Sequence, residues 1–254
     1  PVPALFLLLD PAIRADFETT WETRPLPLFG RAEIFDALYR HVRRRALRAP
    51  ARLWTRVLEE LPAFRALPLA LDALQAYPGQ PPAPLREDRT AAELIRFTAA
   101  HAAAAPAEAP RIFGIHEKIL KHLERQPDIL DFRFDIRRAI VDALPELCPR
   151  APGAADALLL CLLRMDLPAE LHSRTLAAAG VCGFDDPQLA DRIVEDLFQV
   201  RNRMQPAAFA RAALSGARGA AREKLRQGLQ RILTNPGERR NPPFSVLGIL
   251  NSPL

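Results

Sequence analysis

Proline placement is the feature that most constrains what this chain of 254 residues can fold into, because the chain contains 25 prolines. A proline in the middle of a helix removes a backbone hydrogen bond and clashes with the preceding turn, whereas the first turn tolerates it. Most of these prolines stand where a segment begins or has just ended, as Pro11, Pro149 and Pro187 do. The prolines therefore cut the chain into many short helices.

The segments between the prolines favour helix over strand. Ala, Leu, Arg and Glu dominate them, and no run of alternating β-branched and aromatic residues is bounded by Asn-Gly or Asp-Gly. We therefore expect an all-α fold. The expected helices cover residues 11–22, 31–48, 50–61, 66–76, 90–104, 113–125, 132–146, 153–165, 169–181, 187–203 and 207–234.

Two irregular stretches suggest how the chain is divided. Residues 77–86 hold four prolines and one glycine, which predicts a linker or loop at 77–89 between an N-terminal helical region (1–76) and a second helical region (90–234). Residues 235–254 leave the helical pattern at Asn235-Pro236-Gly237. Because the run from Phe244 to Leu250 is too apolar for a solvated end, we expect this tail to pack on the protein's own surface or to dock elsewhere.

The second helical region contains a repeated pattern. Three arginines lie 37 residues apart (174 − 137 and 211 − 174), each in a short apolar segment, and a leucine stands 14 residues before each of them. A period of this length is typical of stacked helix pairs. The equivalent residues are Arg137, Arg174 and Arg211, with Leu123, Leu160 and Leu197 before them.

This pattern resembles HEAT and armadillo-type repeats, whose second helix commonly opens with an apolar residue and an arginine, followed by small residues and leucine. Ile136-Arg137 through Ala143-Leu144 carries the match best, and the resemblance extends over about residues 115–222. It implies stacked antiparallel helix hairpins that form a HEAT-like α-solenoid. It also implies that protein partners bind to the surface of the array.

Residues with catalytic potential do not form a known motif. His116-Glu117 is followed by His122, six residues after His116 rather than the four of zinc proteases, so the two rings would point about 120° apart on a helix. Asp186-Pro187 is typical of the start of a helix, where the aspartate caps the first turn. No nucleophile, phosphate-binding or dinucleotide-binding pattern is present. We therefore expect no catalytic, cofactor-binding or metal-binding residues.

The composition, with 49% hydrophobic and 26% charged residues, is that of a globular protein. The apolar run at residues 2–9 falls short of the roughly 20 residues that cross a bilayer, so no membrane span is expected. The three cysteines, Cys148, Cys161 and Cys182, show no C-x-x-C spacing and predict neither a disulfide framework nor a zinc site. With no signal peptide pattern at the start, a reducing, cytoplasmic location fits best.

The positive charge is carried almost entirely by arginine. The net charge is +5, and only three of the 35 basic residues are lysines. Codon bias in a GC-rich genome would give this composition without any function, whereas two clusters at helical spacing predict basic faces that bind a partner. The clusters are Arg40, Arg44 and Arg48, and Arg218, Arg222 and Arg226.

These observations predict a non-enzymatic scaffold or adaptor for protein–protein interaction, with a partner that carries an acidic segment. Nucleic acid is the alternative partner, since phosphates attract the same arginines. A further alternative is an enzyme similar to the HEAT-like DNA glycosylases, which use aromatic and acidic residues in a basic groove. This chain offers only Trp21 and Trp54 for such a role.

Overall fold

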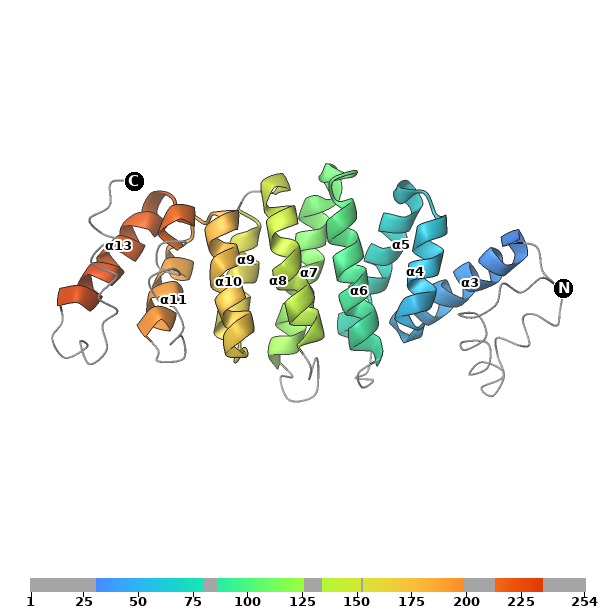
Figure 1. The fold of residues 1–254 in the computed structure, drawn as a ribbon, viewed down its shortest axis with the longest axis horizontal. Helices are drawn as coiled ribbons and strands as arrows, with labels where there is room; N and C mark the ends of the chain where they lie inside the picture. Colours follow the sequence, from blue (N-terminus) through green and yellow to red (C-terminus); the bar gives the residue numbers. More distant parts are fainter. Residues whose placement is uncertain (1–30, 80–85, 126–133, 152, 199–212, 235–254) are drawn as a thin grey trace.

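The computed structural model describes residues 31–79, 86–125, 134–151, 153–198 and 213–234, and these residues form an all-helical fold (Figure 1). One isolated β-bridge, between Phe184 and Ala217, is the exception within this part of the chain. The helix expected at 11–22 and the tail at 235–254 lie outside the described residues. None of the described helices combines the length and the apolar character that crossing a bilayer requires.

The observed elements follow the expected helices closely. They are α3 (Arg31–Arg45), η1 (Ala46–Arg48), α4 (Ala51–Glu60), α5 (Ala63–Gln75), η2 (Tyr77–Gly79), α6 (Arg86–His101), η3 (Pro106–Glu108), α7 (Ala109–Arg125), α8 (Asp135–Leu147), η4 (Cys148–Arg150), α9 (Ala155–Arg164), α10 (Ala169–Cys182), α11 (Pro187–Phe198) and α13 (Gly219–Thr234).

Prolines mark the beginnings of several helices, as the sequence predicts. Four of them stand directly before a helix or at its first residue: Pro50, Pro62, Pro168 and Pro187. Two others lie inside helices, Pro68 in α5 and Pro145 in α8. Because α5 accommodates Pro68, it begins at Ala63, before the expected start at residue 66.

The helices between α4 and α11 alternate between two rows (Figure 1). In one row α4 contacts α6, α6 contacts α8, and α8 contacts α10; in the other, α5 contacts α7, α7 contacts α9, and α9 contacts α11. Contacts between α5 and α6, α7 and α8, and α9 and α10 join the rows. At the two ends, α3 packs on α4 and α13 packs on α11. The apolar core lies between the rows.

Helices α6, α8 and α10 each bury residues at a spacing of four, which places those residues on one side of the helix. These residues are Ala91, Ile95 and Ala99, then Ile136, Ile140 and Leu144, then Leu171, Thr175 and Ala179. The helices that lie between them in the sequence differ in length, since α7 has 17 residues and α9 has 10.

The two described arginines of the 37-residue pattern stand in different environments, and the repeat itself stays a prediction. Arg137 is only 3% exposed and lies over the ring of Phe134, whereas Arg174 is exposed and pairs with Asp142. The leucines also differ: Leu123 is fully buried, and Leu160 is half-buried against the core. The side chains of Leu197 and Arg211 lie outside the described residues.

The expected linker at residues 77–89 lies between α5 and α6, which pack directly against each other. Its first residues form η2, and residues 86–89 form the first turn of α6. The hydroxyl of Tyr77 donates to Oδ1 of Asp88 at 2.8 Å, and both side chains are buried. This bond ties the two ends of the stretch together. The division into regions 1–76 and 90–234 stays a prediction.

The helix expected over residues 207–234 is broken before α13. The Phe184 N–H donates to the carbonyl oxygen of Gly216 at 3.0 Å, and the Arg218 N–H donates to the carbonyl oxygen of Phe184 at 2.9 Å. These two bonds hold residues 217–218 in an extended conformation beside the end of α10. Gly219 then begins α13 with a φ of 45°, a conformation that glycine adopts at little cost.

Cys148 and Cys182 form a disulfide, which corrects the expectation that the cysteines are unpaired. Cys148 follows α8 and Cys182 ends α10, so the bond joins neighbouring helices of one row across a Cα–Cα distance of 5.1 Å. The sequence does not reveal the pair because its members are 34 residues apart and meet only through helix packing. Cys161 is a buried free thiol, and burial raises its pKa.

Opening this disulfide should destabilise the protein. Because the bond closes a chain segment of 34 residues, its loss should lower the free energy of unfolding by about 3–4 kcal/mol. We expect a lower melting temperature in excess dithiothreitol and in the variant Cys148→Ser with Cys182→Ser. Cys161→Ser is the control and should keep its sensitivity to the reductant. Equal melting temperatures with and without reductant would contradict the assignment.

Candidate functional site

The most strongly charged part of the fold is the turn between α3 and α4. Residues 37–58 contain seven arginines and no aspartate or glutamate. All seven are exposed. We call them the N-terminal arginine cluster: Arg40, Arg43, Arg44, Arg45, Arg48, Arg52 and Arg56. The predicted residues Arg40, Arg44 and Arg48 belong to it.

Buried hydrogen bonds hold this turn in place. The Trp54 Nε1–H donates to the carbonyl oxygen of Ala46 at 2.9 Å, and Ala46 has a φ of 45°. The buried Thr90 hydroxyl of α6 donates to the carbonyl oxygen of Ala49 at 3.0 Å. Leu47 between them is fully buried. The turn, which carries Arg48 and joins the arginines of α3 to those of α4, is therefore fixed to both α4 and α6.

The predicted C-terminal cluster is engaged within the protein to a greater degree. The guanidinium group of Arg218 lies directly over Gly183, where an added Cβ would be 2.8 Å from Nη2. Arg222 is half-buried, and Arg226 is exposed. Lys224 between them pairs with Asp191 of α11 at 2.5 Å. Since α3 and α13 lie at opposite ends of the rows, the two predicted clusters do not form one surface (Figure 1).

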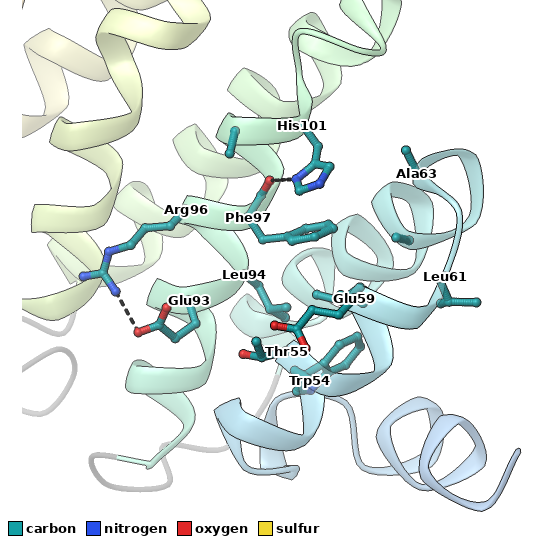
Figure 2. A pocket seen from close by; sticks show the side chains of 13 residues that line it. Trp54, Thr55, Glu59, Leu61, Ala63, Glu93, Leu94, Arg96, Phe97 and His101 are labelled. Carbon is teal, nitrogen blue, oxygen red and sulfur yellow. Dashed lines mark hydrogen bonds and ion pairs between the residues drawn. The ribbon is translucent and has the colours of Figure 1, made fainter. Parts of the chain in front are cut away.

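A groove with a volume of about 470 Å³ lies beside the N-terminal arginine cluster, between α4, α5 and α6 (Figure 2). The buried side chains of Trp54, Leu58 and Leu94 form its apolar floor. Phe97 and His101 stack on each other with ring centroids 4.0 Å apart and form one end of the wall. His101 donates from Nδ1 to the carbonyl oxygen of Phe97 at 2.9 Å, which fixes the stack.

Two ion pairs stand at the rim of this groove. Glu59 of α4 pairs with Arg56 at 3.7 Å, and Glu93 of α6 pairs with Arg96 at 3.0 Å. Each pair joins residues three apart on one helix, and all four side chains are well exposed, so each contributes less than about 1 kcal/mol. A ligand at the rim could therefore rearrange these side chains at little cost.

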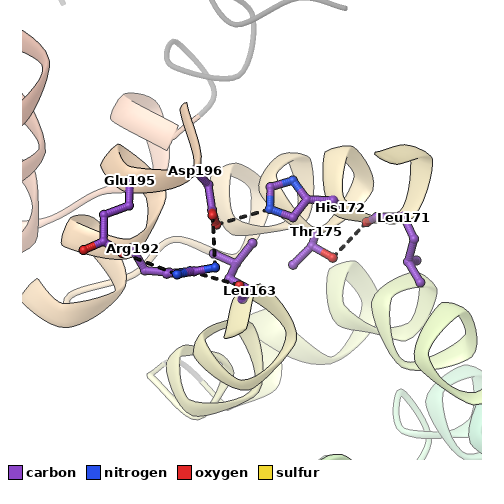
Figure 3. A network of polar contacts seen from close by, with 7 residues as sticks. All are labelled: Leu163, Leu171, His172, Thr175, Arg192, Glu195 and Asp196. Carbon is purple, nitrogen blue, oxygen red and sulfur yellow. Dashed lines mark hydrogen bonds and ion pairs between the residues drawn. The ribbon is translucent and has the colours of Figure 1, made fainter. Parts of the chain in front are cut away.

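A second group of polar side chains joins α9, α10 and α11 (Figure 3). Asp196, which is 3% exposed, lies 3.2 Å from Nε2 of His172 and 3.2 Å from Nη2 of Arg192. Arg192 also donates from Nε to the carbonyl oxygen of Leu163 at 3.0 Å. The contact between Arg192 and Asp196 lies within α11, and the other two join α11 to α10 and to α9, so the group is a packing element.

Buried acidic groups stabilise the turn before α11. Asp156 accepts the N–H groups of Asp185 and Asp186 through Oδ2, both at 3.0 Å. Burial raises the pKa of Asp156, against the opposing effect of these two donors. Asp186 in turn accepts the N–H of Gln188 at 2.8 Å, which confirms the capping role that the sequence predicts for it.

The two histidines of the near-motif in α7 are separated, as their spacing predicts. His116 is fully buried in the core, and His122 packs edge-on against the ring of Tyr77 with centroids 5.9 Å apart. Within the described residues, no three His, Cys, Asp or Glu side chains converge in a way that could hold a metal ion.

The sequence interpretation identified the arginines but not the groove. Its floor and wall come from three helices whose residues are up to 47 apart (101 − 54), and only their packing brings them together. The sequence feature that points to the groove is the spacing of Phe97 and His101, two aromatic rings four residues apart on one helix. Comparisons with protein family models, with curated proteins and with solved structures find no match for this chain.

His116 should make the protein sensitive to acid. Burial lowers its pKa from 6.5 to about 4, so the folded protein keeps the ring neutral while the unfolded chain binds a proton below pH 6.5. The free energy of unfolding therefore keeps its full value above pH 6.5. It decreases by about 3 kcal/mol as the pH falls from 6.5 toward 4. We expect His116→Leu to remove this acid-dependent decrease in the free energy of unfolding, measured by urea unfolding at a series of pH values.

His122→Leu is the control for this experiment, since it leaves the buried ring of His116 in place. It should therefore keep the acid dependence of the wild-type protein. An unchanged pH profile in His116→Leu would contradict this role.

Proposed function

We propose that the chain is a HEAT-like α-solenoid that works as a non-enzymatic scaffold for protein–protein interaction. We further propose that the N-terminal arginine cluster binds an acidic segment of a protein partner. The observation that carries this proposal is the run of seven exposed arginines in residues 37–58 without a single carboxylate. Such a surface attracts negative charge, and arginine pairs with carboxylates in a bidentate geometry.

The alternating rows of helices support the solenoid interpretation. Each helix from α6 to α9 contacts the helices two positions before and after it, so the array extends by adding helices at its ends. Solenoids of this type present long surfaces to which partners bind. This supports a scaffold as the role of the fold.

Two arginines of the cluster lack a carboxylate partner within the protein as described. Arg56, by comparison, pairs with Glu59, and Arg96, Arg111 and Arg174 in the rest of the fold also pair with carboxylates. Arg43 and Arg44, by contrast, make no ion pair with any residue in the described ranges. An acidic partner would supply the missing carboxylates.

The disulfide between Cys148 and Cys182 bears on the cellular location of the protein. The expected cytoplasmic location rested on unpaired cysteines, and the disulfide between Cys148 and Cys182 removes that support. Disulfides persist mainly in oxidising compartments. We therefore propose that the protein works where this bond is stable.

Nucleic acid is the second candidate partner, because the same arginines suit phosphate. The glycosylase-like alternative has less support, since Trp54 lies buried in the groove floor with its N–H bonded to Ala46, and Trp21 lies outside the described residues. The partner test therefore compares an acidic peptide with a DNA duplex.

Charge reversal tests the proposal. A fluorescent peptide of alternating Glu and Ser should bind the full chain, and Arg43→Glu with Arg44→Glu should weaken it on the order of tenfold, because two attractions become repulsions. The matched control is Arg125→Glu with Arg164→Glu, at exposed positions of α7 and α9. This variant should keep most of the affinity for the peptide. The measurement is fluorescence anisotropy at several salt concentrations.

Two outcomes would overturn the proposal. Failure of the acidic peptide to bind at low salt would remove the basis for an acidic partner. Tighter binding of a random duplex, with an affinity that falls steeply between 50 and 200 mM salt and depends on the same arginines, would replace it with nucleic-acid binding.

A further inference from the structure

The groove and the N-terminal arginine cluster share helix α4. Arg52 and Arg56 lie one turn apart on this helix, and Thr55 and Glu59, three residues after each of them, line the groove. Three residues turn the helix by about 300°, so the stripe of Arg52 and Arg56 lies about 60° from the stripe that lines the groove. The cluster therefore continues to the edge of the groove.

The groove suits an apolar side chain. Its volume of about 470 Å³ falls in the range of about 300–1,000 Å³ that is typical of ligand pockets, and its floor of Trp54, Leu58 and Leu94 is apolar. Leu61, which is half-buried, and Ala63, which is exposed, extend this apolar lining toward the solvent.

The charges at the groove leave its opening suited to an acidic segment. The carboxylates of Glu59 and Glu93 are each matched by an arginine on the same helix. Arg43, Arg44 and Arg45 add positive charge at the end of α3, which packs on α4. An acidic segment would therefore lie over the arginines, while an apolar residue next to it reaches the groove.

We propose that the groove between α4, α5 and α6 holds an apolar anchor residue of the same acidic protein segment that binds the N-terminal arginine cluster. This inference rests on the proposed function and adds the chemistry of the partner. The partner segment combines a run of Asp or Glu with a Phe or Leu a few residues away. The arginines attract the segment, and the groove selects it by its anchor.

Two peptides test the inference on the full chain. Both peptides begin with six glutamates, followed by a two-residue Gly-Ser spacer. The anchored peptide then ends in Phe-Leu, and the unanchored peptide ends in Ser-Ser. We expect the anchored peptide to bind at least about tenfold more tightly, because burying one large apolar side chain has an effect of this size. Fluorescence anisotropy measures both affinities.

Variants of the groove locate the anchor. Ala100→Trp fills the groove from an exposed lining position and should remove the tenfold advantage while leaving the unanchored affinity unchanged. Ala63→Trp, at an exposed lining position of α5, should also remove the advantage and guards against misfolding of the first variant. Ala157→Trp, at an exposed position of α9, is the matched control and should have no effect.

The outcomes separate this inference from the proposed function. If neither peptide binds, the proposed function fails and the inference with it. If both peptides bind equally, the arginine cluster binds acidic segments but the groove takes no anchor. An advantage that survives in both Ala100→Trp and Ala63→Trp would place the anchor elsewhere and overturn the inference.

Discussion

Contact between each helix and the next but one along the chain is the constraint on which the rest of this structure depends. Short connections force successive helices into opposite rows, and each helix then buries its apolar side against both rows. Positions such as Ile95 and Ile140 are fully buried for this reason. Most charged side chains, with exceptions such as Arg137, Asp156 and Asp196, are left on the outside, where they are available to a partner.

The same packing gives the two ends of the array different properties. At the C-terminal end, Arg218 lies over Gly183 and Lys224 pairs with Asp191, so basic groups serve the fold itself. At the N-terminal end, the turn between α3 and α4 is fixed by the bond from Trp54 to Ala46, and its arginines point outward. A rigid turn between two helices that carry exposed arginines loses little conformational freedom when it binds, which favours the end near α3 as the binding end.

Local sequence patterns predicted the helices and the capping role of Asp186, because proline placement and capping depend on neighbouring residues. The disulfide could not be predicted, since Cys148 and Cys182 meet only after α8 and α10 pack. The 37-residue repeat stays a prediction: Arg137 is buried and Arg174 exposed, and the third copy lies outside the described residues. The arginines of the candidate site were visible as a charge run, whereas the groove exists only where three helices converge.

Hydrogen–deuterium exchange of the full chain, with and without an acidic peptide that carries a Phe-Leu anchor, tests most directly whether the N-terminal end is the binding end. The account predicts slower exchange in residues 46–61 of the turn and α4 and in residues 93–101 of α6, with no change in α9, α10, α11 and α13. Slower exchange confined to α9–α13, or no change in either half, would contradict it.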